Sequence, residues 1–128
     1  MNGQIVFISR SRVKDGKLDQ LKEFLRRGTP ELETDKPRTI AFLPYLNEEG
    51  TELAIVHVFH DAAAFDAHLE GAGERSEAAY EFIDTAAIEI YGPATEGTLE
   101  MMRGITTTGA RFEHHPDVVG GFLRPAAG

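Results

Sequence analysis

The segment around residues 38–60 constrains the fold most strongly, because it contains two strand-like runs separated by a turn. "RTIAFLPYLN" and "TELAIVHVFH" are rich in β-branched and aromatic residues, and they flank "NEEG", which ends in glycine. This pattern predicts an antiparallel hairpin with strands over 39–47 and 51–60. Both strands carry apolar side chains on both faces, so neither face of the sheet is expected to remain in water.

A further strand and an amphipathic helix precede this hairpin. "QIVFISRSRV" (4–13) alternates side to side and is apolar on both faces at its start, which predicts a strand. Asp15 is placed to cap the helix that follows, in which leucines recur at spacings of three and four: Leu18, Leu21 and Leu25. Gly28 and Pro30 predict a kink or break there, because an interior proline loses a hydrogen bond and clashes with the preceding turn.

Two helices and a last strand are expected after the hairpin. Asp61 is predicted to cap a short helix that ends at "GAG" (71–73), and "ERSEAAYEFIDTA" predicts a second helix over 74–86. "IEIYG" predicts a short strand that stops at Pro93. The order strand, helix, strand, strand, helix pair, strand is typical of an α+β, ferredoxin-like antiparallel sheet with helices on one face. Residues 1–93 are therefore expected to form one domain.

Helices can cover only one face of such a sheet. The other face still carries apolar side chains, among them Val6, Ile8, Val56 and Val58. Exposed apolar patches of this size mark interfaces. A face-to-face homodimer is therefore expected.

Residues 94–128 lie outside the ferredoxin-like pattern. "TEGTLEMMR" predicts a short helix, "TTTGARFEHH" an alternating strand, and "PDVVGGFLRPAAG" an irregular tail. The extension holds too many large apolar residues for a purely disordered end: Phe112, Val118, Val119, Phe122 and Leu123. We expect it to pack on its own subunit or on the partner subunit.

Composition excludes several classes of function. The 128 residues include no cysteine, which excludes disulfides, thiolate metal sites and a cysteine nucleophile. The net charge of -8 argues against a nucleic-acid or anionic-membrane surface, because phosphate binding needs a clustered positive field. The first apolar run is too short for a signal sequence or a membrane span, so a cytoplasmic protein is expected.

Several stretches together resemble a known family. The opening "ISRSRVKDGKLDQLKEFL", the hairpin "NEEGTELAIVHVF", the helix start "DAAAFDAHL" and the closing "IEIYGP" are similar to the antibiotic biosynthesis monooxygenase-type domains. The resemblance implies a dimeric α+β barrel. It also implies one of the family's activities, which include cofactor-independent oxidation of hydroquinone or anthrone-like polyketides and haem degradation.

The resemblance further implies a ligand cavity between the sheet and the helices. By analogy, Ser9, His57 and Phe59 would line this cavity, with Tyr45, His68 and Tyr80 as further substrate-binding candidates. The haem-degrading members have asparagine and tryptophan where this chain has Ser9 and Phe59, and the chain lacks tryptophan. Haem degradation is therefore not expected, and no cofactor is predicted.

The histidines of "HVFHDAAAFDAHL" do not predict a metal site. Residues three apart on a strand face opposite sides of the sheet, so His57 and His60 should diverge. His60 also directly precedes the Asp61 cap, where it is placed to pack on Phe65. Metal ligands must instead converge within about 2 Å of one point.

Cofactor-free oxygenation requires fewer protein groups than a metal site does. Dioxygen reacts poorly with closed-shell molecules, so the substrate must first be made electron-rich by loss of a proton. A histidine suits that step because its pKa lies near neutrality. His57, which the alternation and the resemblance both place on the helix-side face, is the candidate catalytic base, with Ser9, Tyr45 or Tyr80 bonding the substrate oxygen.

Two interpretations of His57 stay open. In the first, it is the base of a monooxygenase acting on a small aromatic or polyketide-like substrate. In the second, it is a buried, hydrogen-bonded core histidine, and the chain is a non-catalytic small-ligand binding or interaction module on the same fold. No phosphate loop, serine elbow or Walker pattern supports a third reaction class.

Overall fold

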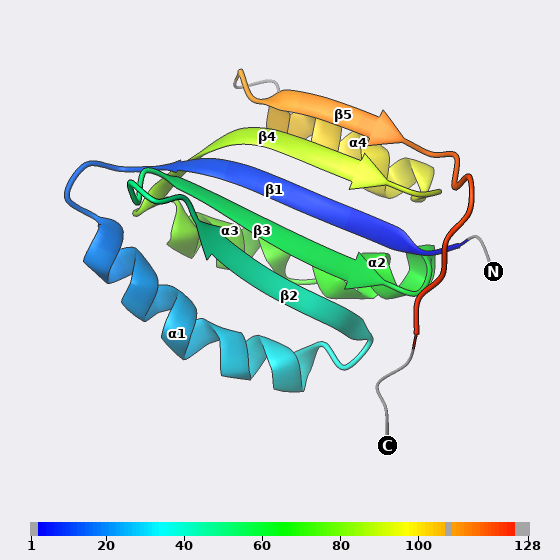
Figure 1. Ribbon diagram of the computed structural model, residues 1–128, viewed down its shortest axis with the longest axis horizontal. Helices are drawn as coiled ribbons and strands as arrows, with labels where there is room; N and C mark the ends of the chain where they lie inside the picture. The colour runs from blue at the N-terminus through cyan, green and yellow to red at the C-terminus, as the bar shows by residue number, and fades with distance from the viewer. Residues whose placement is uncertain (1–2, 107–108, 125–128) are drawn as a thin grey trace.

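The computed structural model describes residues 3–106 and 109–124, and its centre is a five-stranded sheet (Figure 1). The strands are ordered β2-β3-β1-β4-β5, and they are β1 (Ile5–Val13), β2 (Thr39–Leu46), β3 (Glu52–Phe59), β4 (Ile83–Tyr91) and β5 (Arg111–His115). The helices are α1 (Leu18–Asp35), α2 (Ala62–Leu69), α3 (Ala72–Ala79) and α4 (Glu96–Thr106). In Figure 1, α2, α3 and α4 lie behind the sheet, and α1 runs along its β2 edge. None of the helices in the described ranges is long and apolar enough to cross a membrane.

The predicted hairpin is confirmed. β2 and β3 pair antiparallel, with Leu46 opposite Leu53 at the turn. The Asn47 side chain organises the turn, since its Oδ1 accepts hydrogen bonds from Thr51 N at 2.8 Å and Glu52 N at 3.0 Å. Gly50 supplies the positive φ of 70° that the turn requires.

The predicted break in the first helix is wrong. α1 begins at Leu18 without a side-chain cap, so Asp15 does not cap it, and it continues through Pro30 to Asp35. Pro30 deletes one backbone hydrogen bond, but the carbonyl that loses its partner belongs to exposed Arg26 and can bind water instead. The Thr29 hydroxyl also donates to Leu25 O at 2.7 Å. The helix therefore survives the proline, with a weakened centre.

Replacing Gly28 with alanine should strengthen α1. A Cβ at this position would meet nothing within 4 Å, and alanine is better than glycine inside a helix by about 1 kcal/mol. We expect a gain of that size in the free energy of unfolding, measured by urea denaturation. Gly50→Ala is the control, because its Cβ would lie 2.7 Å from Leu18 Cδ2 at a positive φ, and it should lower stability. No gain for Gly28→Ala would contradict the weakened centre.

The predicted helix over 74–86 is also wrong in its second half. α3 ends at Ala79, and β4 starts at Ile83 after a turn closed by Phe82 N donating to Ala79 O at 2.9 Å. β4 pairs with β1 over nearly its whole length. This pairing outweighs the local helical pattern, because strand formation depends on neighbours that are distant in sequence. Glu70 and left-handed Gly71 separate α2 from α3, and Gly73 of the predicted stop lies inside α3.

The extension after residue 93 joins the same sheet. α4 crosses behind the sheet and returns the chain to β5, which pairs parallel to β4; a parallel pair requires such a crossover. The sheet is therefore mixed, whereas a purely antiparallel one was predicted. Leu99, Met102 and Phe112 from the extension pack in the main core. Residues 116–124 are irregular as predicted, and positions 107–108 and 125–128 of the predicted strand and tail lie outside the described residues.

The described part of the tail, residues 116–124, includes large apolar side chains that do not pack in the core. Val119 is fully exposed and Phe122 is 76% exposed. Packing on the partner subunit, the other part of the expectation, stays a prediction.

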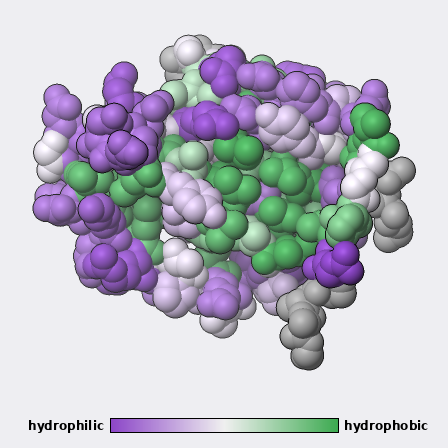
Figure 2. Space-filling view, viewed as in Figure 1, coloured by the Kyte–Doolittle hydropathy of each residue, from purple (hydrophilic) through white to green (hydrophobic). Residues whose placement is uncertain are grey.

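The two faces of the sheet differ sharply. Both apolar cores lie on the helix side, one around Phe59 and Phe65 and the other around Leu21 and Leu53. The opposite, open face shows a continuous apolar area at its centre (Figure 2). The strand registers place five side chains together there, which we term the open-face patch: Val6, Ile8, Leu43, Val56 and Val58.

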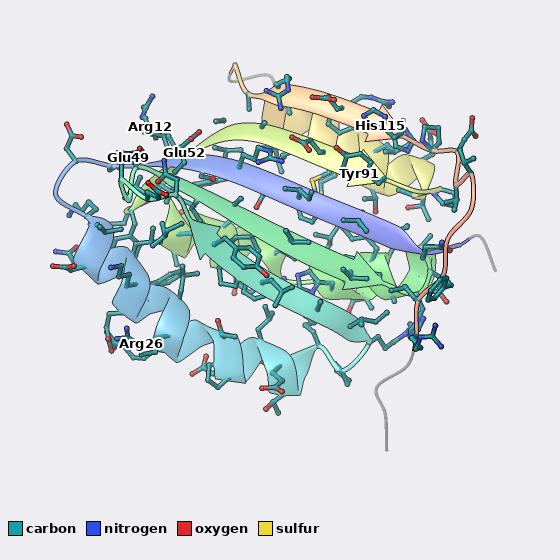
Figure 3. All side chains as sticks on the ribbon, in the orientation of Figure 1. Arg12, Arg26, Glu49, Glu52, Tyr91 and His115 are labelled. Atoms are coloured by element: carbon teal, nitrogen blue, oxygen red, sulfur yellow. The ribbon has the colours of Figure 1, made fainter. Side chains whose placement is uncertain are left out.

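A polar cluster borders the open-face patch over β4 and β5. Glu89 accepts hydrogen bonds from Arg10 Nε at 2.7 Å, Arg111 Nη2 at 3.1 Å and the Tyr91 hydroxyl at 2.8 Å. The hydrogen bond from Arg10 is the largest cause that lowers the pKa of Glu89. Tyr91 stacks on His115 with ring centroids 4.8 Å apart (Figure 3). These contacts tie the extension to the central strands.

Candidate active site

His57 lies at the centre of an aromatic cluster on the helix side of the sheet. β3 directs it inward beside Phe59, two positions further on, and it is 5% exposed. Its ring stacks on Phe7 of β1 at a centroid distance of 4.5 Å and meets the edge of Phe42 of β2 at 5.1 Å. Phe65 of α2 closes the cluster by packing on Phe7 and Phe59.

The surroundings of His57 define which nitrogen is basic. Nδ1 lies 3.0 Å from Phe7 O. A carbonyl oxygen can only accept, so Nδ1 must carry the hydrogen, and the lone pair of the neutral ring is then on Nε2. Burial lowers the pKa of His57 to about 4. At neutral pH the ring is therefore uncharged and can accept a proton at Nε2.

His68 is the second buried histidine of the cluster. Asp61 caps α2 by accepting from Ala64 N at 2.8 Å, as predicted, which sets the helix so that Phe65 and His68 share its inner side. The His68 and His57 ring centroids are 5.2 Å apart, and His68 Nδ1 lies 2.7 Å from the Thr39 hydroxyl. Burial, followed by the charges of its neighbours, lowers the pKa of His68 to about 3.

The structure brings together only part of the predicted site. His57, Phe59 and His68 meet in the cluster, and half-buried Ser9 lies on the same face of β1, two residues from Phe7. Tyr45 does not meet them. It pairs with Ala54 on the open face and is 57% exposed. Tyr45 lies three positions after inward-facing Phe42, so strand alternation directs it to the opposite side.

Tyr80 also lies apart from the cluster. It forms the end of α3, is 41% exposed, and makes no ring contact with His57 among the described residues. Conversely, sequence reasoning missed Phe7 and Phe42 as neighbours of His57, and Thr39 as the hydrogen-bond partner of His68. Phe7 and Phe42 had a signal, because Phe7 lies on the same side of its strand as Ser9 and Phe42 lies opposite His57 in the predicted hairpin. The contact between Thr39 and His68 depends on tertiary packing.

The structure gives no group of three or more side chains that could hold a metal ion within residues 3–106 and 109–124. His60 is exposed at the end of β3 and is not part of the cluster around His57. The predicted divergence of these two histidines is thus observed.

The histidine cluster is closed to solvent. His57 and His68 are 5% and 4% exposed. A groove of about 540 Å³ lies elsewhere, between α1 and the turn that precedes β4, where Phe24 and Phe82 form part of its lining. A ligand can therefore reach His57 only if part of the wall around the cluster moves.

The buried histidines should make the protein sensitive to acid. The pKa of His57 is lowered to about 4 by burial, so the unfolded chain binds this proton first as pH falls from 6.5. The corresponding stability is complete above pH 6.5 and is lost as pH approaches 4, by about 3 kcal/mol for His57. Urea denaturation at pH 7.5, 6, 5 and 4 measures this loss. His57→Gln should show a smaller loss, and equal losses would contradict a neutral His57.

Comparisons with known proteins identify the fold. No model of a protein family matches the chain, and no curated protein matches its sequence significantly. MupZ from Pseudomonas fluorescens superposes with a TM-score of 0.72 over 97% of both chains, at 18% identity. SnoaB, a cofactor-independent oxygenase from Streptomyces nogalater, superposes with a TM-score of 0.58 at 14% identity, over 73% of this chain and 95% of SnoaB.

A candidate antibiotic biosynthesis monooxygenase from Bacteroides thetaiotaomicron also superposes, with a TM-score of 0.56 at 15% identity, over 69% of this chain and 85% of that one. The chain has the antibiotic biosynthesis monooxygenase-type fold. The ferredoxin-like α+β prediction is therefore confirmed. The superposition on SnoaB covers a length of chain similar to that of the predicted first domain. The superposition on MupZ covers nearly the whole chain and therefore includes residues of α4 and β5.

Proposed function

We propose that the protein is a cofactor-independent monooxygenase that oxidises a small aromatic or polyketide-like substrate, such as a hydroquinone or an anthrone. The observation that carries the proposal is a neutral, buried His57 with its basic Nε2 inside an aromatic cluster. The cluster lies between the sheet and α2 of a monooxygenase-type fold. One of the similar structures is that of a cofactor-independent oxygenase.

In the proposed reaction, His57 Nε2 takes a proton from a phenol or from an acidic carbon of the substrate. The resulting anion is electron-rich enough to reduce dioxygen. In the anthrone case, a new C–O bond forms at the CH₂ carbon, the O–O bond breaks, and both hydrogens of that carbon are lost. One oxygen atom remains as a ketone and the other leaves as water, so the substrate supplies all the electrons.

The low pKa of His57 is compatible with this role. Burial destabilises an isolated imidazolium ion and so lowers the pKa of His57. When the proton comes from a bound substrate, an imidazolium and an anion form together, and their attraction in a low-dielectric site offsets the cost of burial. The phenylalanine walls exclude water, which would otherwise protonate the anion.

Three further residues are proposed to contact the substrate. Phe59 and His68 line the cluster directly, and Ser9 lies on the same face of β1 with a hydroxyl that can bond a substrate oxygen. For access, we propose that the second half of α1 moves, since within the described residues only Lys36 Nζ joins its end to the C-terminus of α2 by hydrogen bonds. Leu21 is the one fully buried residue of α1, and Gly28 and Pro30 weaken the helix beyond it.

We also propose a homodimer formed through the open-face patch. In a monomer, these side chains would place a continuous apolar area in water (Figure 2). The same patch on a second subunit would cover it by an isologous contact. Two such sheets facing one another would complete the predicted α+β barrel.

A second candidate function is ligand binding without chemistry. It is favoured by the closed packing of the cluster, where His57 Nδ1 and His68 Nδ1 both have hydrogen-bond partners. The two functions differ in whether His57 Nε2 meets the ligand. Nitrogen NMR of the histidine side chains, with 1,8-dihydroxyanthraquinone added as an unreactive product-like ligand, tests this. A shift of His57 Nε2 supports the proposed base, and binding without a shift at His57 supports the second function.

A further inference from the structure

Two basic side chains converge beside the histidine cluster. Lys36, the C-cap residue directly after α1, donates from Nζ to Ala67 O and Glu70 O, at 2.9 Å each. Arg75 of α3 donates from Nη1 to Glu70 O at 3.0 Å and from Nη2 to His68 O at 2.6 Å. Both cations are half-buried and share one acceptor. Arg75 holds the backbone of the residue whose ring faces His57.

Acidic side chains in direct contact do not balance the charges of Lys36 and Arg75. Within the described residues, neither Lys36 nor Arg75 has a carboxylate within 4.0 Å, although the chain has a net charge of -8. Asp35 acts on Arg75 from longer range, but burial outweighs it and lowers the pKa of Arg75. The C-terminus of α2 offers about half a negative charge at most. Two full positive charges therefore exceed what capping this short helix requires.

The positive charges of Lys36 and Arg75 affect the pKa values of the buried histidines. After burial, the positive charge of Arg75 contributes to the lowered pKa of both histidines, and Lys36 contributes at His68. An anion at Lys36 and Arg75 would remove this effect. The pKa of both rings would then rise, which would make His57 a stronger base when a ligand is bound. The arrangement thus links an anion outside the cluster to proton transfer within it.

We propose that the ligand of the histidine cluster is an aromatic carboxylic acid whose carboxylate binds between Lys36 and Arg75. This deepens the proposed function and rests on it for the position of the aromatic ring. Lys36 has one N–H left after its two carbonyl contacts, and Arg75 has three left after its own. A carboxylate, with two oxygens and one charge, matches this small number of donors better than a phosphate does.

The test compares 2-naphthoate with 2-naphthamide by isothermal titration calorimetry at pH 7.5. The two probes have the same ring and nearly the same shape, neither is an oxidisable hydroquinone, and only the first is charged. We expect wild-type protein to bind 2-naphthoate about tenfold more tightly, as is typical of one hydrogen bond to a charged group. Lys36→Met and Arg75→Met should each remove most of this preference, and Lys36→Arg should retain it.

The controls separate charge recognition from folding. Lys22→Met removes one charge from an exposed position on α1 and should leave the preference unchanged. Unaltered affinity for 2-naphthamide shows that the pocket of a variant is intact. Equal affinity for the two probes in wild-type protein, no binding of either, or an equal effect of Lys22→Met overturns the proposal. A retained preference together with no oxygen uptake would refute the monooxygenase function alone.

Discussion

Replacing His57 with glutamine should reduce substrate-dependent oxygen uptake by at least about 100-fold, the lower end of what a general base contributes. Glutamine keeps a hydrogen-bond donor near Phe7 O and fills a similar volume, but it cannot take a proton from the substrate. Initial rates in an oxygen electrode, at saturating anthrone, measure the effect. Thermal unfolding checks that the variant is folded.

His60→Gln is the matched control for this experiment. His60 lies three positions away at the exposed end of β3, so the same substitution there should leave the rate within about twofold of wild type. A His57→Gln rate close to wild type would rule out His57 as the base. If His68→Gln lost activity instead, the base would be His68, whose ring centroid lies 5.2 Å from that of His57.

Introducing a charge into the open-face patch should abolish the proposed dimer. Val56 lies opposite Ile8 on one side and Leu43 on the other, so Val56→Glu places a carboxylate in the middle of the patch. In a face-to-face dimer, two such charges would be buried without partners, which costs several kcal/mol and weakens association by at least about 100-fold. Sedimentation velocity at 10 μM distinguishes monomer from dimer.

A substitution on the far side of the molecule provides the control. Ala78→Glu adds the same charge at an exposed position of α3, behind the sheet, and should leave the assembly unchanged. If wild-type protein is already a monomer at this concentration, the dimer is refuted. If Val56→Glu is still a dimer, the interface lies elsewhere.

Strand alternation and capping account for most of what the sequence could predict. The hairpin, the Asp61 cap of α2 and the inward direction of His57 depend on residues close together in the chain, and each is found in the structure. The error at Ile83 has a different origin. That segment has a helical pattern locally, but β1 lies beside it and supplies the hydrogen bonds of a strand.

In the candidate site too, local patterns predict some features and contacts between distant segments decide the others. Alternation places His57 and Phe59 inward, but the approach of His68 to His57 depends on how α2 packs on the sheet. The pair of cations beside His68 comes from the residue after α1 and from within α3, and no local pattern connects Lys36 with Arg75. Parallel pairing of β5 likewise depends on the path of α4 behind the sheet.

The central claim is that this chain oxidises an electron-rich aromatic substrate with dioxygen and no cofactor. Its most direct test is oxygen consumption by purified, metal-free protein in the presence of an anthrone or a hydroquinone, with product analysis under ¹⁸O₂. We predict uptake above the uncatalysed rate, with one ¹⁸O atom in the anthraquinone formed from anthrone. No uptake above the rate in buffer across the panel, or product without ¹⁸O, would contradict the account.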